Sequence, residues 1–306
     1  MKKVLIVKLG ALGDVVRSTV LLSELSKRFD EIHWLTSKSA LDLLNSSKIF
    51  KKYIYENEEN KNSLINQDFD LIINLEEDKQ ILEFVSLVKT KKLIGHFLNL
   101  SLPLGVDYTP ECNYWLDMSF ISKKYSREEA DLIKLQSKIS VPEIWYDMVF
   151  GENVWNGQEY DLGVSPKPLN EIKGKIGLID VTESKWPNKY WQGYTELKKM
   201  LQDDGFIVES LGFRPTLKEH VDDINNCEII VCGDTSGMHI ALALKKRVVA
   251  IFNCTPPDEI YDYGRMKKIV SPLLEKYFLK RIDDYGAQSV ISVEEVYNVV
   301  KELLKS

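Results

Sequence analysis

The sequence of 306 residues has only four cysteines, and none of them form a closely spaced pair. Cys227 and Cys232 are the nearest two, and they enclose the apolar segment EIIV. Structural zinc and iron–sulfur sites usually draw their ligands from CxxC pairs, so this spacing argues against such a site. The pattern predicts reduced thiols in the core of a cytosolic protein.

The sequence also lacks a long apolar run and an excess of positive charge. Only the four residues VLIV separate Lys3 from Lys8 and no small-residue cleavage site follows, so we expect no signal peptide. No stretch approaches the roughly 20 apolar residues that span a membrane. The formal net charge of −6 argues against a broad nucleic-acid surface but allows a local basic pocket for a phosphate. We therefore expect a cytoplasmic protein without a transmembrane segment; peripheral association with a membrane stays open.

Short apolar runs alternate with longer helical patterns through most of the chain. Such alternation predicts parallel sheets covered by helices, and a chain of this length favours two domains of about 150 residues each. Residues 141–171 contain three prolines and three glycines without sustained periodicity, which is typical of a linker. We therefore expect two successive α/β domains, 1–160 and 161–306, with a last helix at about 293–304.

The first notable turn is LGALGD, which joins the apolar run VLIV to a helical pattern. Gly10 and Gly13 permit a tight turn and a close approach of a ligand to the backbone. Their spacing is G-x-x-G, which differs from the G-x-G-x-x-G of dinucleotide-binding proteins. Asp14 fits three interpretations at this point: a solvated loop acid, a helix cap or a catalytic base. Arg17, one helical turn later, is either a contact to an anionic acceptor group or a solvated residue.

The second turn lies in VCGDTSGMHIALAL, where a strand ends and an apolar helix begins. The backbone N–H groups of Thr235, Ser236 and Gly237 predict an anion site at the start of this helix. Asp234 precedes them, and His239 follows in the first helical turn. A histidine in this position is either a ligand contact or a hydrogen-bonded structural residue.

The third turn, VTESKWPNKYW, follows the predicted strand KIGLID and carries Lys185. Lys185 is either a phosphate contact or a solvated loop lysine. The sequence also contains a D-x-D pattern, Asp68 and Asp70, immediately before the apolar run LIINL. Its position favours an ordinary pair of loop acids, and we expect no metal site.

Three segments together resemble the heptosyltransferase-type glycosyltransferases of family 9. They are VKLGALGDVVRSTVLLSEL, ESKWPNKYW and CGDTSGMHIALALKKRVVAIFNCTPP, and their order and separation also agree with that family. The resemblance implies a GT-B architecture, in which two Rossmann-like domains face a central cleft. It implies that the N-terminal domain binds the acceptor, that the C-terminal domain binds the nucleotide-sugar, and that the last helix packs back on the N-terminal domain.

The resemblance also implies roles for individual residues. Asp14 falls on the catalytic base and Lys185 on a lysine that contacts the donor phosphates. Asp234, Thr235 and His239 fall on the donor-binding motif. Ser236 departs from the family pattern, which has glycine at this position, and here the glycine follows at Gly237.

The implied activity is an inverting, metal-independent glycosyl transfer, with heptose from ADP-heptose as the expected donor sugar. The nucleotide-sugar is a substrate, and no cofactor is expected. The acceptor is a hydroxyl of a lipopolysaccharide, another glycan, a lipid-linked glycan or a protein. Two alternatives stay open: a different Rossmann-type nucleotide-dependent enzyme, and a catalytically inactive protein that binds sugar nucleotides.

Overall fold

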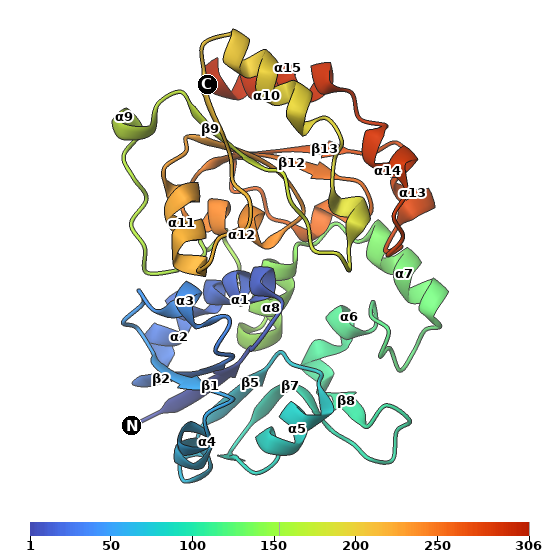
Figure 1. Cartoon of the computed structure of the whole chain (residues 1–306). Helices are drawn as coiled ribbons and strands as arrows, with labels where there is room; N and C mark the ends of the chain where they lie inside the picture. Colours follow the sequence, from blue (N-terminus) through green and yellow to red (C-terminus); the bar gives the residue numbers. More distant parts are fainter. Residues whose placement is uncertain (153, 306) are drawn as a thin grey trace. The chain divides into compact units, whose positions relative to one another are not determined.

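The computed structural model describes residues 1–152 and 154–305. The chain divides into two compact units, Met1–Gly163 and Val164–Ser306, and each unit is built on its own sheet (Figure 1). Both sheets consist mainly of parallel strands, so the expected α/β class with two Rossmann-like units is confirmed. None of the helices in the described part of the chain has both the length and the apolar character that a membrane span needs.

The sheet of the first unit has six strands in the order β3-β2-β1-β5-β7-β8. All neighbours are parallel except β7 and β8, which are antiparallel. The four residues of the VLIV run lie in the central strand β1 and are fully buried, as expected for a strand covered on both faces. The strands are β1 (Lys3–Val7), β2 (Glu31–Thr36), β3 (Lys51–Ile54), β5 (Leu71–Asn74), β7 (Leu93–Leu98) and β8 (Val106–Tyr108), with β4 (Asp68–Phe69) and β6 (Lys89–Thr90) in a separate two-stranded sheet.

The helical pattern that follows LGALGD is divided in the structure. It consists of α1 (Leu12–Ser18), the 3₁₀ turn η1 (Thr19–Leu21) and α2 (Leu22–Arg28). At the division, the hydroxyl of Ser18 donates to the carbonyl of Val15 and that of Thr19 to the carbonyl of Val16. Such local bonds compete with the regular helical ladder and account for the interruption.

The predicted linker at 141–171 is wrong in its first part, because residues Val141–Phe150 form the helix α8. Pro142 lies in the first turn, where proline has no intrahelical bond to lose. Ile144, Trp145 and Tyr146 are buried. The other helical segments of this unit are α3 (Leu41–Leu44), α4 (Glu58–Ile65), α5 (Lys79–Val85), η2 (Pro110–Cys112), α6 (Asn113–Leu116) and α7 (Arg127–Gln136).

The sheet of the second unit has five parallel strands in the order β10-β9-β11-β12-β13. Helices α10 and α15 cover one face of this sheet, and α11 and α12 cover the other (Figure 1). The strands are β9 (Lys175–Ile179), β10 (Ile207–Ser210), β11 (Ile229–Gly233), β12 (Arg247–Phe252) and β13 (Met266–Val270). The helical segments are α9 (Leu169–Ile172), η3 (Pro187–Lys189), α10 (Tyr194–Asp203), α11 (Leu217–Asn225), α12 (Ser236–Ala243), η4 (Pro257–Glu259), α13 (Leu274–Tyr277), α14 (Tyr285–Ser289) and α15 (Val293–Lys305).

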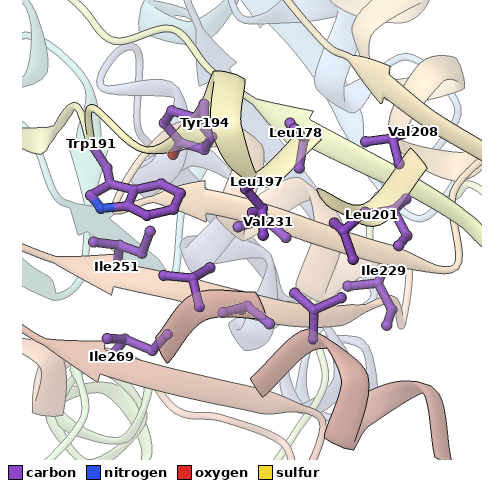
Figure 2. Packing of buried hydrophobic residues seen from close by; sticks show 14 of the residues in the cluster. Leu178, Trp191, Tyr194, Leu197, Leu201, Val208, Ile229, Val231, Ile251 and Ile269 are labelled. Atoms are coloured by element: carbon purple, nitrogen blue, oxygen red, sulfur yellow. The ribbon is translucent and has the colours of Figure 1, made fainter. Parts of the chain in front are cut away.

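The core of the second unit lies between the sheet and the helices α10 and α15. Side chains of the strands, such as Leu178 and Val231, face Leu197 and Leu201 of α10 (Figure 2). Val296 and Val300 of α15 belong to the same buried cluster. The last helix therefore belongs to the core of the second unit, and its apolar side chains complete that core over β9 and β12.

Candidate functional site

The carboxyl end of β11 leads directly into α12, and this junction carries the predicted donor motif. β11 ends at Gly233, and Thr235 precedes α12 in an extended conformation. Within the described residues, the Thr235 side chain makes no capping bond to α12. The first backbone N–H groups of a helix have no intrahelical acceptor. The start of α12 therefore presents hydrogen-bond donors and the positive end of the helix dipole at the carboxyl end of β11.

The structure brings Asp234 together with a lysine and a histidine. The Nζ atom of Lys189 lies 2.9 Å from Oδ2 of Asp234, and Nε2 of His239 lies 3.9 Å from Oδ1. The side chains are 18%, 14% and 5% exposed for Lys189, Asp234 and His239, respectively. A carboxylate, an ammonium and an imidazole thus meet beside the N-terminus of α12.

Lys189 was not among the residues that the sequence singled out. Lys185, which was, lies in an exposed turn four residues earlier, and it makes no ion pair with Asp234 in the described residues. Both lysines belong to the segment ESKWPNKYW. No signal in the sequence distinguished Lys189, which ends the turn Pro187–Lys189 and reaches the end of β11 through its ion pair with Asp234.

The segment that carries Lys189 is held firmly at the edge of the second sheet. A Cβ atom at Gly233 would lie 2.3 Å from the carbonyl oxygen of Lys189, so only glycine permits this approach. The side-chain amide of Asn253 donates to the carbonyl of Tyr190 at 2.9 Å. Gln288 donates to the carbonyl of Pro187 at 3.2 Å, which fixes the start of the same turn.

Two cations lie against one aromatic ring near this end of the sheet. Nζ of Lys189 is 5.2 Å, and Cζ of Arg281 is 4.6 Å, from the ring centroid of Trp186. Trp186 packs on a small buried cluster that includes Cys254. Burial raises the pKa of the Cys254 thiol to about 11, so this thiol is neutral at pH 7.

In the first unit, Asp14 lies in the first turn of α1 and is paired with Arg17. Nε of Arg17 lies 3.1 Å from Oδ1 of Asp14, and the Asp14 side chain is 29% exposed. The residue at the N-cap is Ala11, in the left-handed conformation with φ 51°. Asp14 is therefore inside the helix by three residues, where a carboxylate is favourable at the dipole end.

The turn before Asp14 is fixed by a buried ion pair. Oε1 of Glu76 accepts hydrogen bonds from the backbone N–H groups of Leu9 and Gly10, at 2.7 and 3.2 Å. The same oxygen lies 2.9 Å from Nζ of Lys8. A Cβ atom at Gly10 would meet no atom within 4 Å, so the protein does not itself require glycine there. Gly13 is the second residue of α1.

Arg17 is positioned by the unpredicted helix α8 as well as by Asp14. Its Cζ atom lies 5.6 Å from the ring centroid of Trp145, which is buried. Trp145 in turn makes an edge contact with Trp115, and Trp115 with the buried His96 of β7. Burial lowers the pKa of His96 to about 4, so this imidazole is neutral at pH 7.

The D-x-D pattern lies away from these residues. Asp70 precedes β5 and accepts a hydrogen bond from the backbone N–H of Lys3 at 2.8 Å. It also pairs with Lys91 at 2.7 Å. Residues 1–152 and 154–305 contain no group of three or more histidine, cysteine, aspartate or glutamate side chains placed to hold a metal ion.

Comparison with known proteins places the segment from Asp234 to His239 within a match to a family model. Residues 208–282 match the model of glycosyltransferase family 9 (heptosyltransferase). The matched segment includes β11, the N-terminus of α12 and the motif from Asp234 to His239.

Whole-chain comparisons point in the same direction. Lipopolysaccharide heptosyltransferase 1 of Campylobacter coli is 23% identical over 343 residues and is covered to 98%, as is this chain. A family 9 glycosyl transferase from Veillonella parvula superposes with a TM-score of 0.70 at 15% identity, covering 99% of this chain and 97% of that one. E. coli heptosyltransferase WaaC with ADP superposes with a TM-score of 0.64 at 13% identity, covering 98% and 99%. The expected GT-B fold is thereby confirmed.

Proposed function

We propose that the chain is a heptosyltransferase-like glycosyltransferase of family 9, which transfers a heptose from ADP-heptose to an acceptor hydroxyl with inversion. One observation carries the proposal. At the N-terminus of α12 a carboxylate and an imidazole, Asp234 and His239, lie inside the segment that matches the family model and meet the ammonium of Lys189.

In this proposal the second unit, from about residue 161, binds the nucleotide-sugar. The backbone N–H groups of Thr235, Ser236 and Gly237 donate to the diphosphate at the positive end of α12. Asp234 and His239 bind hydroxyl groups of the sugar, because a carboxylate that faced the diphosphate would repel it. Lys185 is exposed and contacts the diphosphate as negative charge develops on it.

The first unit presents the acceptor, and Asp14 is the proposed general base. As the acceptor oxygen attacks the anomeric carbon, its proton passes to the Asp14 carboxylate, and the carbon–oxygen bond to the diphosphate breaks. ADP leaves with the bonding electrons, on the face opposite the attack, which inverts the configuration. Arg17 orients the carboxylate through its bond to Oδ1 and is a candidate contact for an anionic group of the acceptor.

The acceptor that we propose is a hydroxyl of a lipopolysaccharide core or a related glycan, lipid-linked or protein-bound. This part of the proposal follows the relative from Campylobacter coli, whose name states lipopolysaccharide as its substrate class. Because the lysine and the helix terminus stabilise the leaving diphosphate, the proposed reaction needs no metal ion or cofactor. Activity is therefore expected to continue in EDTA.

The first test measures thermal stability in the presence of ADP, UDP, GDP, CDP or NAD. A ligand at 100 times its dissociation constant adds about 2.7 kcal/mol to the free energy of unfolding. We expect ADP to stabilise the protein more than the other nucleotides. Stabilisation by NAD without a response to any nucleoside diphosphate would overturn the proposal in favour of another Rossmann-type enzyme.

The second test replaces the proposed base. Asp14→Asn should abolish the release of ADP from ADP-heptose in the presence of acceptor and should leave ADP affinity unchanged, because the carboxylate acts on the acceptor. Asp42→Asn, at an exposed acid of α3, is the matched control and should keep the full rate. If Asp14→Asn keeps most of the rate, Asp14 is not the base.

A further inference from the structure

We infer that Lys189 is a positioning residue of the donor site, which compensates the charge of Asp234 so that a nucleoside diphosphate can bind beside it. This inference rests on the proposed function, because it concerns the same donor. It assigns a role to a residue that the motif DTSGMH does not contain.

The need for such a residue follows from the charges at the start of α12. Asp234 is next to the backbone N–H groups that are proposed to bind the diphosphate, and its side chain is only 14% exposed. A carboxylate shielded from water by burial repels a diphosphate more strongly than an exposed one. The site therefore needs a cation that neutralises Asp234 without occupying the anion-binding groups.

Lys189 meets this requirement by its geometry. Its Nζ atom lies 2.9 Å from Oδ2 of Asp234, while the other oxygen, Oδ1, is the one nearer His239. The lysine side chain is itself 18% exposed. A partly buried ion pair of this kind is screened little by salt, so the compensation holds at ordinary ionic strength.

The backbone around Lys189 is held in place before any ligand binds. Its carbonyl oxygen contacts Gly233 so closely that a Cβ atom there would lie at 2.3 Å. The next residue, Tyr190, accepts a bond from Asn253, and the indole N–H of Trp191 donates to the carbonyl of Ile291 at 2.9 Å. Little conformational freedom remains to be lost on binding, which distinguishes Lys189 from the exposed Lys185.

Trp186 adds a second restraint on the lysine. Lys189 and Arg281 both lie against its ring, at 5.2 and 4.6 Å from the centroid. The ring attracts both cations by its quadrupole. Lys189 is thus held by an aromatic face and by one carboxylate oxygen.

A double-mutant cycle on ADP binding tests the inference. The variants are Lys189→Met, Asp234→Asn and the double variant, each measured by isothermal titration with ADP on the full chain. We expect Lys189→Met to weaken ADP binding at least tenfold, because the positive charge of Lys189 beside Asp234 is lost. In the Asp234→Asn background the same change should cost less than threefold, because no charge remains to be compensated.

Two further variants separate charge from packing. Lys189→Arg keeps the charge and should stay within about threefold of the wild-type affinity, whereas Lys189→Gln keeps a hydrogen-bond donor and should lose affinity like Lys189→Met. Lys198→Met, at a partly exposed lysine of α10 that donates to Ser210, is the matched control and should bind ADP normally. The thermal unfolding of each variant shows whether it is folded.

The outcomes distinguish this inference from the proposed function. Equal losses on Lys189→Met with and without Asp234 would overturn the positioning role and indicate a direct contact with the diphosphate. Normal affinity in Lys189→Met and Lys189→Gln would overturn any role for Lys189, while wild-type binding of ADP would leave the proposed function standing. If the wild-type protein binds UDP, GDP or CDP in place of ADP, the proposed donor is wrong and the cycle is measured with that diphosphate. If it binds none of them, both proposals are overturned.

Discussion

Replacement of Gly233 by alanine should disturb the donor site and the stability of the second unit together. The added Cβ atom would lie 2.3 Å from the carbonyl oxygen of Lys189 and 3.4 Å from its carbonyl carbon. The obstacle is backbone and cannot rotate away as the end of a flexible side chain does. The turn is held further by the bonds of Asn253 and Gln288 to its neighbours.

The size of the effect follows from this contact. The carbonyl oxygen has to move by about 1 Å before it reaches the 3.4 Å of an ordinary van der Waals contact. Overpacking of this kind typically costs about 1–3 kcal/mol in the free energy of unfolding. A value near 2 kcal/mol corresponds to a fall in Tm of about 4–8 °C for a domain of this size. The same displacement separates Nζ of Lys189 from Asp234, so ADP affinity should fall with stability.

The assay is thermal unfolding of wild-type protein and variants at one protein concentration, followed by titration with ADP. Gly212→Ala is the control, because a Cβ atom there meets no atom within 4 Å and the residue lies in the same unit. We expect the control to stay within about 0.5 kcal/mol of the wild type. A Gly233→Ala variant with the Tm and ADP affinity of Gly212→Ala would refute the argument that glycine is required for this approach.

Two further predictions concern the first unit. Burial lowers the pKa of His96 to about 4, so between pH 6.5 and 4 the unfolded chain binds more protons than the folded one. Stability present above pH 6.5 should therefore be lost as the pH falls towards 4, by up to about 3 kcal/mol, and His96→Phe should remove this part of the slope in urea unfolding. Glu76→Gln removes the ion-pair partner of the buried Lys8 and should lower the free energy of unfolding by about 3 kcal/mol. Glu76→Asp keeps the carboxylate and should lose less stability. Equal stability of Glu76→Gln and the wild type would show that the ion pair contributes nothing.

The strands at the centre of each sheet were predictable because they are covered on both faces. Such strands consist of nearly continuous apolar residues, as in VLIV of β1 and IIV of β11. β13 was missed for the opposite reason. It is an edge strand with the sequence MKKIV, in which two adjacent lysines break the apolar run.

The mispredicted helices contain single residues that are compatible with two different local structures. Pro142 was read as part of a linker, but proline is equally at home in the first turn of a helix, which is where α8 has it. Ser18 and Thr19 gave no sign in the sequence that their hydroxyls would bond to the preceding turn and interrupt the helix. In each case tertiary packing decides which of the two local structures forms, and the local sequence does not reveal that packing.

The candidate donor site shows the same division between local and distant information. Asp234 and His239 are five residues apart, so the strand-to-helix pattern alone predicted that they lie near each other. Lys189 reaches Asp234 across 45 positions of sequence, and its approach depends on Gly233 having no side chain. No feature of the sequence favours one lysine of ESKWPNKYW over the other, because the position of this segment beside the end of β11 depends on the tertiary structure.

Lys185 and Lys189 differ in the side-chain entropy that each would lose when the donor binds, and this difference supports separate roles. Lys189 has lost its freedom in the folded protein, since Asp234, Trp186 and the contact at Gly233 already fix it. Lys185 is exposed in a turn, so ordering it on the diphosphate costs up to about 2 kcal/mol of side-chain entropy. A charge that is already in place contributes fully to the binding of the donor. A charge that must first be ordered contributes most where its attraction is strongest, which is when the leaving diphosphate gains its negative charge. We therefore propose that the fixed lysine serves recognition of the donor and the exposed one the transfer step.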